Sequence, residues 1–237
     1  MHPTLQEYVQ RFPKPESTQT YNKFFTQLSL EEYSQKLPYL FDIENFCARV
    51  FQAKINNEKV CIYSDYDTDA ITATGVMHQG LLDLGFLPEN LSTYAPDRFT
   101  EGYGINPEAM TELVKPNDLI ISVDCGINSV EEADIVKASQ KCDLIITDHH
   151  HLHDQIPDCI AVINPRLADY YTQNPFQKSF YNPNLNNSEL ENAIKNWQQK
   201  VYSSNSQNFL SKSVTGVGVA WFSLVWYAYF CQEIFTN

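Results

Sequence analysis

The chain has 237 residues, 43% of them hydrophobic, which is enough for one large domain with a buried core. Lysine and arginine total 16 against 29 aspartates and glutamates, a formal net charge of −13. This balance argues against a protein that coats duplex DNA by charge alone. It leaves nucleases open, because metal ions offset clustered carboxylates and an acidic protein can still carry a local basic groove.

The six cysteines are spread singly, with no C-x-x-C pair and no spacing typical of a zinc site. Residues 1–11 are polar and do not resemble a signal peptide. We therefore expect reduced, mostly buried thiols and a cytoplasmic location.

Residues 1–50 are predicted to form helical segments and loops broken by prolines, with short amphipathic helices at 30–33 and 42–44. Beyond them, apolar runs alternate with helical spacing. Strands are predicted at 59–64, 91–95, 118–123, 142–147 and 159–163, and helices at 70–84, 106–114 and 129–139, the last capped by Ser129. Such alternation implies crossover connections, so the predicted fold class is α/β, a mostly parallel sheet flanked by helices.

Residues 169–213 are rich in Asn, Gln, Ser and Tyr and are predicted to be a polar insertion with one helix at 188–201. A core helix is then expected within 214–237. The predicted organisation is an N-terminal helical segment (1–50), a core (51–168), the insertion and the core helix.

Within that last segment, residues 213–232 are uncharged and reach the length of a membrane span. Their start, 215–218, is small and turn-like, and 220–230 is aromatic. A buried core helix is the favoured interpretation, and we expect no membrane contact.

Acidic or histidine-rich sequence follows three of the predicted strands directly. The side chains concerned are Asp65, Asp67 and Asp69 after the first strand, Asp124 after the third, and Asp148, His149 and His150 after the fourth. In an open parallel sheet ligands bind at the carboxyl ends of strands, so these groups converge if the strands are neighbours. Each cluster alone is more often a turn, a helix cap or a polar loop. Together they predict a metal centre.

Carboxylates packed this closely would repel one another, and a divalent cation removes the conflict. Mixed carboxylate and imidazole ligands suit Mn²⁺ and, with more oxygen and water ligands, Mg²⁺. Two such ions can activate a water and polarise a phosphoryl oxygen, so we expect two divalent metal ions as cofactors.

These segments resemble the DHH phosphoesterase superfamily and, within it, the RecJ-like branch. Residues 65–69 are similar to its first motif, 123–127 to its second, and 147–150 to the segment that names the superfamily. Residues 96–104 resemble a stretch typical of the RecJ-like branch. Further matching stretches are 163–166 and 216–220, so that the resemblance covers about residues 38–168 and 214–232.

The resemblance implies a DHH-type three-layer domain and a hydrolase, a metal-dependent exonuclease that degrades single-stranded DNA from its 5′ end in repair and recombination. Single-stranded nucleic acid is the expected partner, with a single-strand-binding protein or a helicase as further partners. The implied metal ligands are Asp67, Asp69, Asp124 and His149, with Asp65 as a ligand or immediate support. By the same resemblance His150 contacts the scissile phosphate or the metal-bound water, and Asp148 orients a histidine.

Arg98, Asn164 and Arg166 are the predicted substrate-binding residues. An ion pair of Arg98 with Asp97 or Glu101 remains an alternative, as do turn-capping roles for Asn164 and Arg166. Three nearby aromatic residues, Tyr66, Phe99 and Tyr103, could stack on bases, but core packing is favoured for at least two. Glycines 216 and 218 are interpreted as close backbone packing at a helix start.

The chain departs from the family pattern at Ala70, where glycine is usual, and a further aspartate ligand and a second domain are expected beyond residue 237. Two alternatives therefore stay open. One is a phosphodiesterase of oligonucleotides or cyclic dinucleotides, and the other is a truncated, inactive nucleic-acid-binding scaffold.

Overall fold

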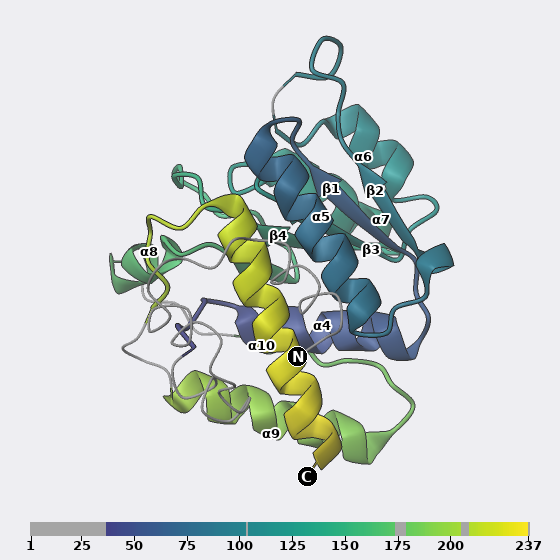
Figure 1. The fold of residues 1–237 in the computed structure, drawn as a ribbon, viewed down its shortest axis with the longest axis vertical. Coiled ribbons are helices and arrows are strands. Elements are labelled where there is room, and N and C mark those ends of the chain that lie inside the picture. Colours follow the sequence, from purple (N-terminus) through teal and green to yellow (C-terminus); the bar gives the residue numbers. More distant parts are fainter. Residues whose placement is uncertain (1–36, 103, 174–178, 205–208, 237) are drawn as a thin grey trace, which may run out of the picture. The chain divides into compact units, whose positions relative to one another are not determined.

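The computed structural model describes residues 37–102, 104–173, 179–204 and 209–236 (Figure 1). The chain divides into two units, residues 1–37 and 38–237, and the second unit contains the sheet and all of the described helices. The helix predicted at 30–33 and the side chain of Tyr103 lie outside the described residues.

Five strands form one sheet in which every neighbouring pair runs parallel, in the order β2-β1-β3-β4-β5. They are β1 (Val60–Ser64), β2 (Leu91–Tyr94), β3 (Leu119–Val123), β4 (Asp143–Thr147) and β5 (Ala161–Ile163). Every residue of β1 and β3 is buried, which explains their continuous apolar sequence. The prediction of an α/β fold with a parallel sheet is confirmed.

The register of the sheet places three motif residues at one level. Ser64 pairs with Val123, and Val123 pairs with Thr147. The next residues along the chain, Asp65, Asp124 and Asp148, therefore leave three adjacent strands side by side. The strand order reverses at β1 and β3, and this switch point is where ligands of open α/β sheets bind.

Helices cover both faces of the sheet (Figure 1). One face carries α4 (Ile43–Ile55), α5 (Thr68–Asp83) and α10 (Gly216–Thr236), and the other carries α6 (Pro107–Leu113) and α7 (Val130–Ser139). A short 3₁₀ helix, η1 (Pro88–Asn90), precedes β2, and α8 (Leu167–Gln173) and α9 (Ser188–Ser204) complete the described helices.

Two of the predicted helix starts have side-chain caps, and one does not. Asp67 accepts a hydrogen bond from the Ala70 N–H, and Asn106 accepts one from the Ala109 N–H. Ser129 precedes α7 as predicted, but its side chain makes no cap hydrogen bond. Its backbone (φ −89°, ψ 63°) lacks the extended geometry that aims a cap side chain at the helix.

Residues 216–232 of the uncharged run lie in α10, whose Trp226, Tyr227 and Phe230 are fully buried. The indole Nε1 of Trp226 donates to the carbonyl of Pro38 at 3.0 Å. This confirms the predicted buried helix. Among the described residues, none of the helices has the length and apolar character needed to cross a membrane.

The predicted polar insertion contributes to the packed layers. Its predicted helix exists as α9 and continues to Ser204. Trp197 of α9 is buried and meets the ring of Phe230 edge-on at 4.7 Å. The boundaries of the predicted domains remain a prediction.

Candidate metal centre

The loop between β1 and α5 carries the three aspartates of the first motif. Asp67 is the N-cap of α5, with its Oδ1 2.9 Å from the Ala70 N–H, and is exposed. Ala70 is buried in the first turn and is not among the residues with positive φ. Alanine in place of the usual glycine therefore carries no backbone cost at this position.

Asp69, in the first turn of α5, is held by the start of α10. Its Oδ2 accepts the N–H of Gly216 at 2.8 Å, and its Oδ1 accepts the N–H of Val217 at 2.9 Å. A carboxylate is stabilised at a helix N-terminus, because the unpaired N–H groups there carry partial positive charge. The Oδ2 atom also lies 3.8 Å from Nε2 of His149.

Asp124 follows β3 with a left-handed backbone (φ 60°), and its side chain is 2% exposed. Its Oδ1 lies 3.1 Å from Nε2 of His149, yet this contact lacks hydrogen-bond geometry, so that Oδ1 is a buried oxygen without a hydrogen bond among the described residues. Burial, followed by the negative charges of Asp69 and Asp148, raises the pKa of Asp124 to about 7. A buried, electron-rich oxygen of this kind suits a cation.

Asp148 is hydrogen-bonded to both histidines and holds the loop that carries them. Its Oδ1 accepts the N–H groups of His149 and His150 at 2.7 and 3.1 Å and lies 2.8 Å from Nδ1 of His150. Its Oδ2 accepts the Ile127 N–H at 2.9 Å. Burial opposes ionisation of this carboxyl, but these hydrogen bonds outweigh it and lower the pKa of Asp148.

The same contact orients the ring of His150. The hydrogen bond to Asp148 raises the pKa of His150. With Nδ1 engaged by a carboxylate, Nε2 is the ring atom that can serve the centre, as in other carboxylate–histidine pairs near metals. A cavity of about 310 Å³ adjoins His150 and is also lined by Ser129, Glu132 and His153.

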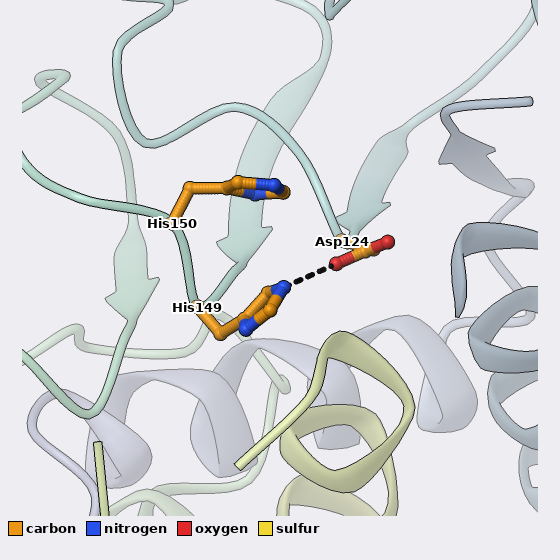
Figure 2. Close-up of side chains that lie close together, drawn as sticks. All are labelled: Asp124, His149 and His150. Atoms are coloured by element: carbon orange, nitrogen blue, oxygen red, sulfur yellow. Dashed lines mark ion pairs between the residues drawn. The ribbon is translucent and has the colours of Figure 1, made fainter. Parts of the chain in front are cut away.

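Asp124, His149 and His150 each offer a ligand atom within 4.8 Å of the others (Figure 2). Figure 2 shows the His149 ring directed at the Asp124 carboxylate, with His150 beside it. Asp69 lies beside this group, because its Oδ2 is 3.8 Å from Nε2 of His149. Asp65 is buried with an Oδ1 that lacks a hydrogen bond among the described residues, and burial raises the pKa of Asp65. Mixed carboxylate and imidazole donors with unsatisfied buried oxygens fit Mn²⁺ or Mg²⁺.

The three predicted substrate contacts have different surroundings. Arg98 forms no ion pair within the described part of the chain, and its guanidinium carbon lies 5.5 Å from the ring centre of Tyr66. The alternative partners are engaged elsewhere. The Asp97 carboxylate accepts the Phe99 N–H, and the Glu101 carboxylate accepts the Asp97 N–H and the Tyr94 hydroxyl.

Asn164 and Arg166 hold the backbone of the histidine loop. The buried Asn164 amide donates to the His150 carbonyl at 3.1 Å, and Nε of Arg166 donates to the His149 carbonyl at 3.0 Å. Contact of either side chain with substrate stays a prediction. Of the three aromatic residues, Tyr66 is half-buried and Phe99 is 93% exposed, so Phe99 is not a core residue.

The backbone at the start of α10 is the part of the centre that sequence reasoning did not place. Gly216 and Val217 donate to Asp69 although the two segments are 147 and 148 residues apart. The signal in the sequence was a pair of glycines at a helix start. That signal predicts close packing but does not identify what packs there.

Comparison with known proteins identifies the family of the chain. Residues 59–207 match the family described as DHH family, N-terminal domain. The single-stranded-DNA-specific exonuclease RecJ of Bacillus subtilis (strain 168) is 43% identical over 119 residues, which is 50% of this chain and 15% of that protein. RecJ of Salmonella typhimurium is 34% identical over 132 residues, 55% of this chain and 22% of that protein.

A crystal structure of exonuclease RecJ bound to manganese superposes with a TM-score of 0.58 at 25% identity, over 83% of this chain and 39% of that one. RecJ of Thermus thermophilus in complex with Mn²⁺ has a TM-score of 0.55 at 21% identity and shares the fold. The matched part of the chain spans less than a quarter of the length of the RecJ proteins of Bacillus subtilis and Salmonella typhimurium. The family match covers more than half of the chain, and the chain belongs to the DHH family, with a RecJ-like DHH domain.

Proposed function

We propose that this chain carries the catalytic DHH domain of a metal-dependent hydrolase, an exonuclease that cuts phosphodiester bonds in single-stranded DNA from the 5′ end during repair and recombination. The observation that carries this proposal is the convergence of Asp69, Asp124, His149 and His150 at the switch point of the sheet. The names of the relatives, which are single-stranded-DNA-specific exonucleases, support the substrate class.

Within this proposal Asp124, His149 and Asp69 hold one divalent ion, and Asp67 and Asp65 supply carboxylates for a second. Mn²⁺ or Mg²⁺ bound there would lower the pKa of a water molecule and polarise a phosphoryl oxygen. Two buried oxygen atoms support this role, Oδ1 of Asp124 and Oδ1 of Asp65, which accept no hydrogen bond from any residue that the structure describes.

The remaining site residues orient groups and supply charge. Asp148 holds a proton at Nδ1 of His150, so that Nε2 can contact a phosphate oxygen of the substrate. Arg98, stacked on Tyr66 and without a carboxylate partner among the described residues, supplies positive charge to the nucleic-acid backbone. We place the domain core at residues 51–168 with 214–237, because α10 packs against α5 beside the site.

The test uses the full chain with Mn²⁺ and single-stranded DNA labelled at the 5′ or the 3′ end. We expect early release of labelled mononucleotide only from the 5′-labelled strand, and little cleavage of a duplex. Asp124→Ala should abolish cleavage. Asp83→Ala is the matched control, because Asp83 is an exposed carboxylate at the opposite end of α5.

Other outcomes would overturn the proposal in distinct ways. Faster cleavage of a dinucleotide than of the long strand would indicate a phosphodiesterase of small substrates. Strand binding without cleavage and without Mn²⁺ binding would indicate a nucleic-acid-binding scaffold. Unchanged cleavage by Asp124→Ala would place the chemistry elsewhere.

A further inference from the structure

Gly216, the first residue of α10, touches the carboxylate of Asp124. A Cβ atom added to Gly216 would lie 2.1 Å from Oδ1, 2.4 Å from Cγ and 2.6 Å from Cβ of Asp124. Real Cβ atoms essentially never come within 3.0 Å of another heavy atom in this way. Any side chain at position 216 must therefore displace either Asp124 or the backbone at the start of α10.

Asp124 has little room to be displaced. Its side chain is 2% exposed, and its N–H donates to the Thr147 carbonyl at 2.8 Å. The atom nearest to the added Cβ, Oδ1, is also the atom 3.1 Å from Nε2 of His149. The clash would thus fall on the oxygen that is the candidate metal ligand.

The same turn of α10 holds a second carboxylate of the centre. The N–H groups of Gly216 and Val217 donate to the two oxygens of Asp69. One backbone turn therefore contacts Asp69 from α5 and Asp124 from the loop after β3. The Asp69 contact needs N–H groups, and the Asp124 contact needs the absence of a side chain.

Backbone freedom does not explain the glycine. Gly216 is not among the glycines with positive φ, so an L-residue could adopt its backbone. Glycine in a helix is also less favourable than alanine. The remaining reason for glycine at position 216 is that a side chain there would clash with Asp124.

We propose that Gly216 is a positioning residue of the metal centre, and that the first turn of α10 sets the placement of the Asp69 and Asp124 carboxylates about the ion. This inference rests on the proposed metal-dependent function. It assigns the glycine a role in metal affinity in addition to helix packing.

The first experiment measures Mn²⁺ affinity by calorimetry on the full chain. Loss of support around a ligand typically weakens metal binding about 10- to 100-fold, and we expect a loss of this size in Gly216→Ala. Gly218→Ala is the control for a clash in the same turn that spares the carboxylates, because its added Cβ would lie 2.9 Å from Cγ2 of Val214 and would meet no carboxylate. Gly75→Ala, with open space around it on α5, is the second control. Both should bind Mn²⁺ as the wild type does, and equal affinity in Gly216→Ala would overturn the inference.

The second experiment needs neither metal nor activity. Asp124→Gly removes all the Asp124 atoms that the added Cβ would meet, and glycine suits the positive φ at that position. In metal-free protein we expect Gly216→Ala to lower the Tm, or to prevent folding, in the wild-type background only. In the Asp124→Gly background the same substitution should leave the Tm unchanged or higher. An equal fall in both backgrounds would refute the contact.

The two experiments separate the inference from the function on which it rests. If the wild-type chain binds no Mn²⁺, the proposed function fails, while the thermal cycle still tests the contact between Gly216 and Asp124. If the wild type binds Mn²⁺ and Gly216→Ala binds it equally well, only the positioning role fails.

Discussion

Replacing Asp148 by asparagine should loosen the histidine loop. The carboxylate accepts four hydrogen bonds, three at Oδ1 and one at Oδ2. The amide of asparagine has one acceptor oxygen, and that oxygen fits best in the position of Oδ1, where three donors converge. The amide nitrogen then faces the N–H of Ile127, and two donors oppose each other in a site that is 1% exposed.

The size of the effect follows from these contacts. A buried donor left without an acceptor costs about 1–3 kcal/mol, and losing the charge weakens each remaining bond by about 1 kcal/mol. We expect the free energy of unfolding to fall by about 4–6 kcal/mol, at or slightly above the range of about 3–5 kcal/mol seen when one partner of a buried charged pair is removed. Urea unfolding of metal-free protein measures it. Asp158→Asn is the control, because the ion pair of Asp158 with Lys137 is exposed and its loss should leave the stability nearly unchanged.

The stability difference between the wild type and Asp148→Asn should also depend on pH. The folded-state pKa of His150 is raised by Asp148, so the stabilisation from protonated His150 is fully present below the unfolded value of about 6.5. It is lost as the pH rises through the raised pKa, because the folded state then loses the proton that it held more tightly. The stability difference between wild type and Asp148→Asn should therefore shrink as the pH rises above about 6.5. NMR titration of the His150 ring should show a lower pKa in the variant. Equal stability and an unchanged His150 titration would refute this account of the loop.

Three further predictions concern the site and the core. Because the pKa of Asp124 is raised to about 7, Mn²⁺ must displace a proton from this carboxyl at acidic pH. Mn²⁺ should therefore raise the Tm more at pH 8 than at about pH 5.5. An equal shift of the Tm at both pH values would contradict a ligand role for Asp124. Asp67→Asn should keep the N-cap hydrogen bond of α5 and change the free energy of unfolding by less than about 0.5 kcal/mol, while weakening Mn²⁺ binding. If calorimetry shows unchanged Mn²⁺ binding, Asp67 caps the helix but is not a metal ligand. Trp226→Ala should cost about 3–5 kcal/mol in urea unfolding, because the indole is 1% exposed and donates to Pro38, and a loss below about 1 kcal/mol would show that α10 is not part of the core.

Much of the fold could be predicted from local pattern. Strands buried on both faces are continuous apolar runs, and β1, β3 and β4 all lie within one or two residues of their predicted bounds. Ser129 shows the limit of such reasoning, since a residue suited to capping did not cap when its backbone turned away from the extended geometry.

The surroundings of Arg98 and Arg166 were not predictable, because both residues have several chemically suitable partners nearby in sequence. The fold of the loop after β2 engages Asp97 and Glu101 with other donors and leaves Arg98 on the ring of Tyr66. Arg166 donates to a carbonyl 17 residues away, at His149. Long flexible side chains take their partners from tertiary neighbours, which local sequence does not specify.

The sequence by itself determined which residue types stand at the strand ends, because strand, acid and histidine are adjacent along the chain. That was sufficient to predict a metal centre, and the resemblance of the same segments to known motifs indicated the DHH family. Only the tertiary structure decided that Asp65, Asp124 and Asp148 leave adjacent strands at one level, because strand order and register arise from long-range pairing. It alone also brought Gly216 against Asp124, since a contact between segments so far apart in the chain depends on how a 21-residue helix packs across the sheet.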